Sequence, residues 1–337
     1  MIRGVDGYKD GIDLGLRCPL EFGKLELSFS CVDRRNSLFT SNDPEKILEF
    51  YASFSNMEEL VEWMKERPRG VPLLKEIEGD EDITVVIPTM DYEGNFAKAC
   101  RDEIFHGMRL IFVESTGDGD FYFNFAHYVN EGVKKALKYS PKWIVYSGDD
   151  MEKIDDVEKL KNGLGTINNK DYDVVFPSPS NYHTVPTYIG RRRLTYDIYK
   201  SLTSLTMEEL YKKFGIDYFY AFPNMRSRAV FRRVSGTEFT NTTAFGIFGY
   251  DFIKRNGGIL FDDTYINEHE DIDLSFNILL KKARTTSITY RIKALRGSSM
   301  VIGKPRELRQ VAGRAYFNYK YSTLLEDRIK KRGKENE

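Results

Sequence analysis

Residues Ile83 to Thr89 read ITVVIPT, a short apolar run that predicts a strand buried on both faces. Similar runs follow at RLIFVE (109–114), KWIVYS (142–147) and YDVVFP (172–177). Segments with helical spacing lie between them, at residues 95–106, 125–139 and 155–164. This alternation predicts an α/β fold with a mainly parallel sheet and helices on both of its faces. Ligands of such sheets bind beyond the carboxyl ends of the strands.

The chain before Ile83 has a different pattern. LELSFSC (25–31) alternates apolar and polar residues and predicts a strand. Asp43 with Pro44 predicts the start of one helix, and Asn56 the start of another that ends before Pro68. We therefore predict an N-terminal α+β extension over residues 1–82, a main domain over 83–305 and a C-terminal helix and tail over 306–337. Residues 178–238, rich in aromatics and arginines, are interpreted as an insertion near the active site.

The composition describes a folded protein without a strong charge bias. Of 337 residues 41% are hydrophobic, which is enough for a core, and the formal net charge is −1. This balance favours neither nucleic acid nor a membrane as a partner. The three cysteines match no zinc or redox spacing, residues 1–20 contain no apolar core typical of a signal peptide, and the sequence has no run of 18 apolar residues. We expect a cytoplasmic protein and leave peripheral membrane contact open.

The first acidic motif is SGDDM (147–151), directly after the third predicted strand. Asp149 and Asp150 are adjacent carboxylates, and like charges this close need compensation by a cation or by hydrogen-bond donors. A hard divalent ion held by one or two carboxylates and by diphosphate oxygens would supply it. The alternative interpretation is a polar turn that caps the next helix.

The second acidic motif is EHEDIDL (268–274), at the start of a predicted amphipathic helix. Carboxylates in the first turn of a helix interact favourably with its dipole, so one interpretation is purely structural. The functional interpretation is a general base presented at the edge of a pocket. His269 is a further candidate metal ligand, although a lone histidine beside carboxylates is more often a surface residue.

Six segments together resemble the GT-A glycosyltransferases, particularly the large inverting family 2. They follow the order and spacing of that family over about three-fifths of the chain, and they read ITVVIPTMD (83–91), LIFVESTGD (110–118), NFAHYVNEGVKKA (124–136), IVYSGDDM (144–151), TAFGIFGYDFIKRNGGILFD (243–262) and EDIDL (270–274). The resemblance implies a GT-A fold, which is Rossmann-like, over residues 83–305. It also implies a hexosyltransferase-type reaction that moves a sugar from a nucleoside-diphosphate-sugar to an acceptor hydroxyl with inversion.

The resemblance implies the donor-binding residues by position. Pro88, Thr89 and Asp91 would line the nucleotide pocket. Glu114 would hydrogen-bond the base or the ribose, at a position where the family usually has Asp.

It implies the metal and catalytic residues in the same way. Asp150 would ligate Mg²⁺ or Mn²⁺, and Asp149 would face the ribose or the metal. Asp271 would be the general base, with Glu270 orienting the acceptor or the loop. The acceptor would be a glycan, a lipid-linked molecule or a protein.

The chain departs from the family at Arg296, where a metal-ligating His is common. Arg cannot ligate a metal but can pair with phosphate oxygens, so Arg296 is a candidate donor-binding residue. Two other functions stay open. A nucleotidyltransferase should have a Gly-rich loop with Lys or Arg after the first strand, and residues 90–94 do not form one. A non-catalytic nucleotide-sugar or carbohydrate-binding protein would not need both Asp150 and Asp271.

Overall fold

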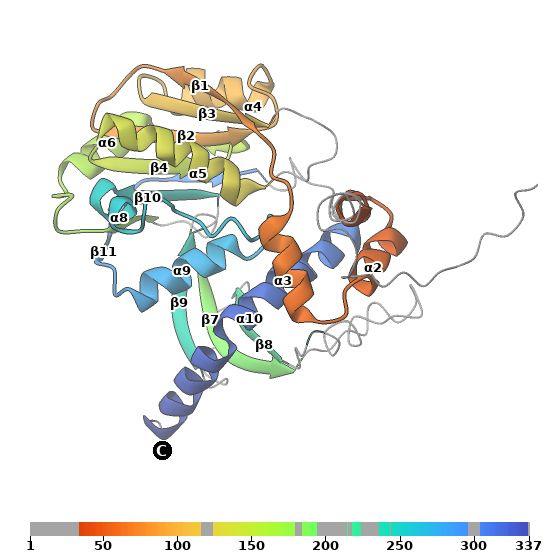
Figure 1. Cartoon of the computed structure of the whole chain (residues 1–337). Helices are drawn as coiled ribbons and strands as arrows, with labels where there is room; N and C mark the ends of the chain where they lie inside the picture. The colour runs from red at the N-terminus through yellow and green to blue at the C-terminus, as the bar shows by residue number, and fades with distance from the viewer. Residues whose placement is uncertain are drawn as a thin grey trace, which may run out of the picture.

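A seven-stranded mixed sheet forms the centre of the molecule (Figure 1). The computed structural model describes residues 34–115, 124–178, 184–193, 214, 218–223, 236–242, 244–295 and 304–335. The strand predicted at 25–31 and much of the predicted insertion lie outside these residues. The sheet order is β1-β3-β2-β4-β10-β6-β11. Its strands are β1 Pro72–Ile77, β2 Ile83–Thr89, β3 Arg109–Ser115, β4 Trp143–Ser147, β6 Val174–Ser178, β10 Phe245–Gly249 and β11 Thr285–Thr289.

Five strands of the sheet run in the same direction. β2 pairs in parallel with β3 and β4, and β6 pairs in parallel with β11. β10 lies antiparallel between β4 and β6, and β1 is antiparallel to β3 at the edge. The predicted α/β class with a mainly parallel sheet is confirmed. The carboxyl ends of β2, β3 and β4 therefore meet at one edge, which we call the carboxyl edge.

Helices cover both faces of the sheet (Figure 1). One face packs against α4 Asn95–Ala99, the π-helical turn η1 Cys100–Ile104 and α6 Val157–Gly165. The other face packs against α5 Phe125–Ala136, α8 Tyr250–Arg255 and α9 Glu270–Leu280. A 3₁₀ turn at Leu137–Tyr139 ends α5. Two layers of buried apolar side chains thus hold the strand ends in fixed positions.

The motif around α5 has a structural explanation. Asn124 caps the helix by accepting from the His127 N–H at 3.1 Å. The buried Asn130 amide donates to the Phe261 carbonyl and accepts from the backbone N–H groups of Leu260 and Phe261. A Cβ at Gly132 would lie 2.3 Å from a Val86 methyl, because α5 packs directly on β2. These residues therefore build the scaffold.

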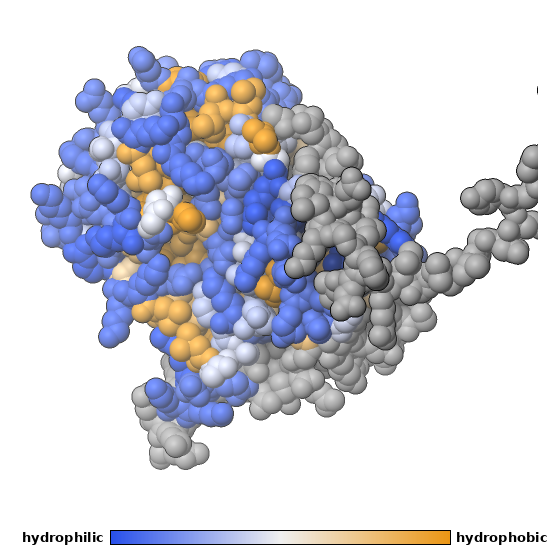
Figure 2. Space-filling model, in the orientation of Figure 1, coloured by the Kyte–Doolittle hydropathy of each residue, from blue (hydrophilic) through white to orange (hydrophobic). Residues whose placement is uncertain are grey.

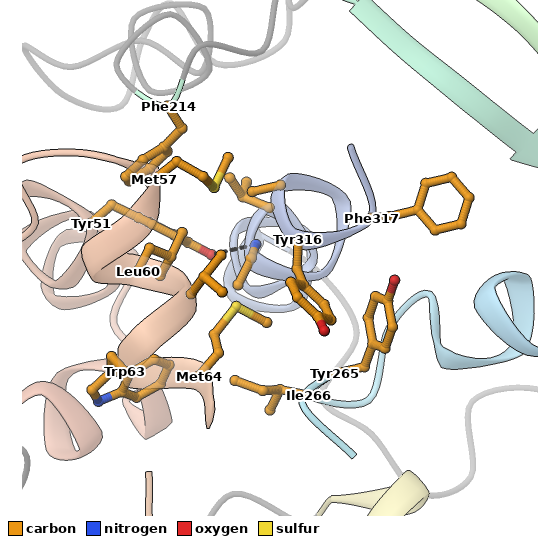
Figure 3. Close-up of a cluster of buried hydrophobic side chains, with 14 of the residues drawn as sticks. Tyr51, Met57, Leu60, Trp63, Met64, Phe214, Tyr265, Ile266, Tyr316 and Phe317 are labelled. Atoms are coloured by element: carbon orange, nitrogen blue, oxygen red, sulfur yellow. Dashed lines mark hydrogen bonds between the residues drawn. The ribbon is translucent and has the colours of Figure 1, made fainter. Parts of the chain in front are cut away.

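A second core joins the two ends of the chain. The helices α2 Pro44–Ala52, α3 Met57–Glu66 and α10 Lys304–Glu335 share one apolar cluster, shown in Figure 3. The Tyr51 hydroxyl lies inside it, donating to the Leu308 carbonyl at 2.7 Å and accepting from the Ala312 N–H at 3.1 Å. The predicted caps Asp43 and Asn56 are confirmed. The sequence predicts a C-terminal helix and tail from residue 306; α10 begins at Lys304, and its first turns pack on α2 and α3.

Two small sheets flank the central one. β5 Met151–Lys153 pairs with β12 Ile292–Ala294, and β7 Thr184–Arg193 lies between β8 Tyr218–Pro223 and β9 Gly236–Thr242. The face of the molecule in Figure 2 is mostly hydrophilic, with scattered apolar residues. Within the described ranges, no helix combines the length and apolar character needed to span a membrane.

Candidate functional site

The carboxyl edge brings together two of the predicted site residues. Thr89 ends β2, and Asp149 follows the end of β4. The Thr89 hydroxyl donates to Asp149 Oδ2 at 2.7 Å, and Thr89 is only 2% exposed. A buried hydroxyl with one strong acceptor fixes the orientation of the carboxylate. The loops after β2 and β4 are thus locked to each other.

The Asp149–Asp150 pair is electrostatically strained. Burial is the main cause that raises the pKa of Asp149, the neighbouring Asp150 raises it further, and the Thr89 hydroxyl works in the opposite direction. Burial, with Asp149 and Asp150 nearby, also raises the pKa of the Cys100 thiol, which donates to the Asp149 carbonyl at 3.3 Å. Cys100 is therefore a neutral packing residue beneath the pair, without thiolate reactivity.

The turn between β4 and β5 folds the Asp150 side chain back over Gly148. A Cβ at Gly148 would lie 2.8 Å from Asp150 Oδ1, so a glycine makes this conformation possible. The Gly148 N–H donates to the Ala244 carbonyl at 2.7 Å, which ties the turn to the start of β10. The Leu295 N–H donates to the Asp150 carbonyl at 2.8 Å. Arg296 itself lies outside the described residues.

The donor set of this pair fits a hard cation. Within the described ranges, no three His, Cys, Asp or Glu side chains converge into a potential metal site. Mg²⁺ does not require such a cage, because one or two carboxylates with water and substrate phosphates suffice. Asp149 and Asp150 provide two oxygen-donor groups, and the raised pKa of Asp149 reflects a charge that a cation would stabilise.

The remaining predicted donor-binding residues differ in exposure. Pro88 is buried inside β2, so its contribution is to the shape of the strand end. Asp91 is exposed, and its carboxylate accepts from the Glu93 N–H at 2.9 Å, which tightens the turn after β2. Glu114 is half-buried near the end of β3, where it accepts from the Tyr92 N–H at 2.9 Å and pairs with Lys75 at 3.1 Å.

The second acidic motif begins on a strained turn. Asn267 and His269 have positive φ values of 53° and 74°, which is uncommon for residues other than glycine. Asn267 accepts from the Phe125 N–H at 2.5 Å, and Glu268 accepts from both Arg306 and Gln310 of α10. Surrounding contacts therefore enforce the conformation, and such enforced strain is found preferentially at functional segments.

α10 also contacts the backbone of this turn. A Cβ at Gly313 would lie 2.4 Å from the Glu268 carbonyl oxygen, so the helix approaches as closely as a glycine permits. His269 packs against the Phe317 ring of the same helix, and burial, followed by the charge of Arg314, lowers the pKa of its imidazole well below the usual range. His269 is thus held neutral.

Glu270 and Asp271 are neighbouring carboxylates in the first turn of α9. Glu270 is 9% exposed, and among the described residues its Oε2 has no hydrogen-bond partner. Burial, reinforced by the charges of Asp271 and Glu268, raises the pKa of Glu270 well above its usual range. Asp271 is half-buried, and its Oδ1 accepts from the Ile272 N–H at 2.7 Å. Asp271 is therefore the more accessible of the two carboxylates.

Asp273, from the same motif, belongs to a structural network that the sequence analysis missed. Lys320 of α10 lies 2.9 Å from Asp273 and 2.7 Å from Asp262, and the hydroxyls of Tyr265 and Tyr316 donate to the same two carboxylates. Burial still raises the pKa of Asp273, although Lys320 counteracts it. No local spacing could have revealed this network, because Asp273 and Lys320 are 47 residues apart.

No protein-family model matches this chain, and no match is found among the curated proteins. The proposal below therefore rests on the geometry at the carboxyl edge and at the start of α9 and on the motif resemblance.

Proposed function

We propose that this protein is a GT-A-type glycosyltransferase that moves a sugar from a nucleoside-diphosphate-sugar to an acceptor hydroxyl with inversion. One observation carries the proposal: the 2.7 Å hydrogen bond from Thr89 to Asp149. It joins the loop after β2, assigned by the motif resemblance to the nucleotide, with the loop after β4, assigned to the metal. Two loops with these roles must be adjacent for one diphosphate to contact both.

In this proposal Asp150 and Asp149 hold Mg²⁺ or Mn²⁺. When bound, such a cation would stabilise the charge that develops on the departing diphosphate, a contribution of several kcal/mol in metal-dependent enzymes. Asp149 contributes a carboxylate already oriented by Thr89, and Asp150 contributes one positioned over Gly148. Arg296, outside the described residues, keeps its predicted role, in which its guanidinium would pair with the diphosphate oxygens.

The proposed base is Asp271, which removes the proton of the acceptor hydroxyl. Its half-buried position leaves it the more accessible carboxylate, while the buried Glu270 beside it favours the protonated form. A protonated Glu270 adds no negative charge near Asp271 and can donate one hydrogen bond to orient the acceptor or the loop. The contacts that enforce the turn at residues 267–269 keep both groups in place.

A transfer assay tests this function. The protein would be incubated with UDP-, GDP- and dTDP-sugars, Mn²⁺ and candidate acceptors, and release of the nucleoside diphosphate would be measured. NMR of the product would give its anomeric configuration. Metal-dependent release of a nucleoside diphosphate with inversion is expected. Release of pyrophosphate from a nucleoside triphosphate and a sugar phosphate would instead identify a nucleotidyltransferase.

A further inference from the structure

Lys75 is a charged residue that the predicted site did not include. It lies on β1, the antiparallel strand at the open edge of the sheet, opposite Phe112 of β3. β1 precedes the predicted main domain, and the sequence analysis did not predict it. Lys75 Nζ is 3.1 Å from Glu114 Oε2, so this strand delivers a cation to a predicted donor-binding carboxylate.

Lys75, Tyr92 and Glu114 form one compact cluster. The Tyr92 N–H donates to Glu114 Oε1 at 2.9 Å, and the Lys75 ammonium lies 4.3 Å from the centroid of the Tyr92 ring. The Tyr92 ring in turn packs edge-on against Phe112 at 5.1 Å between centroids. Each member of the cluster is thus held by another, and the relative positions of the carboxylate and the ammonium are fixed.

The two charged side chains leave hydrogen-bonding capacity for a ligand. The ionised Glu114 accepts only, and each of its oxygens can accept a second hydrogen bond. The Lys75 ammonium has three N–H donors, of which Glu114 uses one, and its side chain is 32% exposed. A ligand that donates to Glu114 Oε2 therefore meets a cationic donor about 3 Å away. Such a ligand must carry a hydrogen-bond acceptor for Lys75 next to the N–H or O–H that it donates to Glu114.

We infer that Lys75 determines the base specificity of the donor site and that, with Glu114, it selects a base with a ring N–H next to a carbonyl, such as uracil or guanine. The ring N–H donates to Glu114 and the carbonyl accepts from Lys75. The carbonyl oxygen of such a base can accept from the Lys75 ammonium. Adenine, in contrast, is most commonly recognised by the neutral side-chain amide of Asn or Gln. The inference rests on the proposed function, because that function places the nucleotide at Glu114.

The test is calorimetric binding of UDP, GDP and ADP to the full chain with Mn²⁺, for wild type, Lys75→Met, Lys75→Arg and the control Lys135→Met. The control breaks a comparable ion pair, because Lys135 binds Glu76 of the same strand at 2.7 Å. Glu76 precedes Ile77 at the end of β1 farther from Glu114. Unfolding midpoints of all four proteins establish that each is folded.

Wild type should bind UDP or GDP more tightly than ADP. Lys75→Met should weaken binding of the preferred nucleotide by about tenfold or more, because a hydrogen bond to a charged group is lost. The affinity for ADP should stay unchanged. Lys75→Arg should restore most of the preference, and Lys135→Met should bind like wild type. A preference for ADP, or a wild-type selectivity ratio that survives in Lys75→Met, would overturn the inference and leave the proposed function standing. Failure of wild type to bind any of the three nucleotides would overturn the inference, whereas the proposed function would still be decided by the transfer assay with the three nucleotide-sugars.

Discussion

The buried aspartates at the two opposite ends of the parallel strands, the amino edge and the carboxyl edge, have different partners and opposite pKa shifts. At the amino edge, Asp173 precedes β6 and pairs with Arg255 at 2.6 Å and Arg284 at 3.0 Å. At the carboxyl edge, Asp149 follows β4, and the groups that orient it include another carboxylate and a neutral hydroxyl. Burial opposes ionisation of Asp173, but the hydrogen bonds from the two arginines outweigh it and lower its pKa to about 2, whereas the pKa of Asp149 is raised.

The cationic partners, rather than the pKa alone, separate structural carboxylates from candidate functional ones, because Asp273 also has a raised pKa and is paired with Lys320. A buried charge paired with arginines is satisfied by the fold itself and needs no ligand. A buried carboxylate whose pKa is raised has a cost in the free protein that a bound cation or substrate can relieve. Asp155, which pairs with Arg291 and Lys159, belongs with Asp173. Glu270, with its raised pKa, belongs with Asp149.

Replacing the proposed base should produce the largest effect. Asp271→Asn should lower kcat by about 10²–10⁴-fold, because proton removal from the acceptor is lost. Its unfolding midpoint should stay close to that of wild type. Asp251→Asn is the matched control, since Asp251 is an exposed aspartate in the first turn of α8. Equal activity of the two variants in the transfer assay would contradict the role of Asp271 as the base and would support the structural interpretation, in which the motif interacts with the helix dipole.

Breaking the ion pairs at the amino edge should lower stability. Asp173→Asn should reduce the free energy of unfolding at pH 7 by about 2 kcal/mol, as measured by urea denaturation. The folded pKa is depressed, so this contribution is present above the ordinary pKa near 4 and is lost as the pH falls towards 2. Wild type and variant should therefore converge in acid. A difference that stays constant with pH would point to packing instead.

The same substitution at the carboxyl edge should act in the opposite direction. Without metal at pH 7, Asp149→Asn should leave the free energy of unfolding unchanged or raise it by up to about 1 kcal/mol. The folded pKa is raised, so the penalty is complete above the folded pKa, declines as the pH falls from there, and is absent below the ordinary pKa near 4. A clear loss of stability at pH 7 would show that Asp149 is a structural residue like Asp173.

A modest effect on ligand binding is expected from the hydroxyl that orients Asp149. Thr89→Val should weaken metal-dependent nucleotide binding by about tenfold, equivalent to roughly one hydrogen bond to a charged group. Thr84→Val on the same strand is the control, because the buried Thr84 hydroxyl has no hydrogen-bond partner among the described residues. Indistinguishable calorimetric affinities for the two variants would contradict the positioning role of Thr89.

The sequence was most informative where structure follows from local patterns. The apolar runs of β2, β3 and β4 predicted strands of a mainly parallel sheet, and the structure places the three side by side with Thr89 and Asp149 at one edge. The helix α8 ends shortly before Gly257 and Gly258, and both adopt the positive φ that glycine favours. Periodicity and capping are local properties, so one sequence suffices to recognise them.

The sequence was least informative where distant segments meet. β1 begins with Pro72 and mixes exposed and half-buried residues, so its pattern does not stand out as a strand, and Lys75 was missed with it. The core shared by α2, α3 and α10 depends on contacts such as Tyr51 with Leu308, 257 residues apart. The Lys320 network is equally non-local. Such pairings depend on the packing of the whole chain, which periodicity does not encode.

We propose above all that Asp149 and Asp150 bind a metal that carries a nucleotide-sugar. The most direct measurement is calorimetric binding of UDP-, GDP- and dTDP-sugars, with and without Mn²⁺, to wild type and Asp150→Ala. We predict metal-dependent binding of one nucleotide class to wild type and its loss in the variant. Absence of binding to wild type with Mn²⁺ present, or equal binding to Asp150→Ala, would contradict the claim.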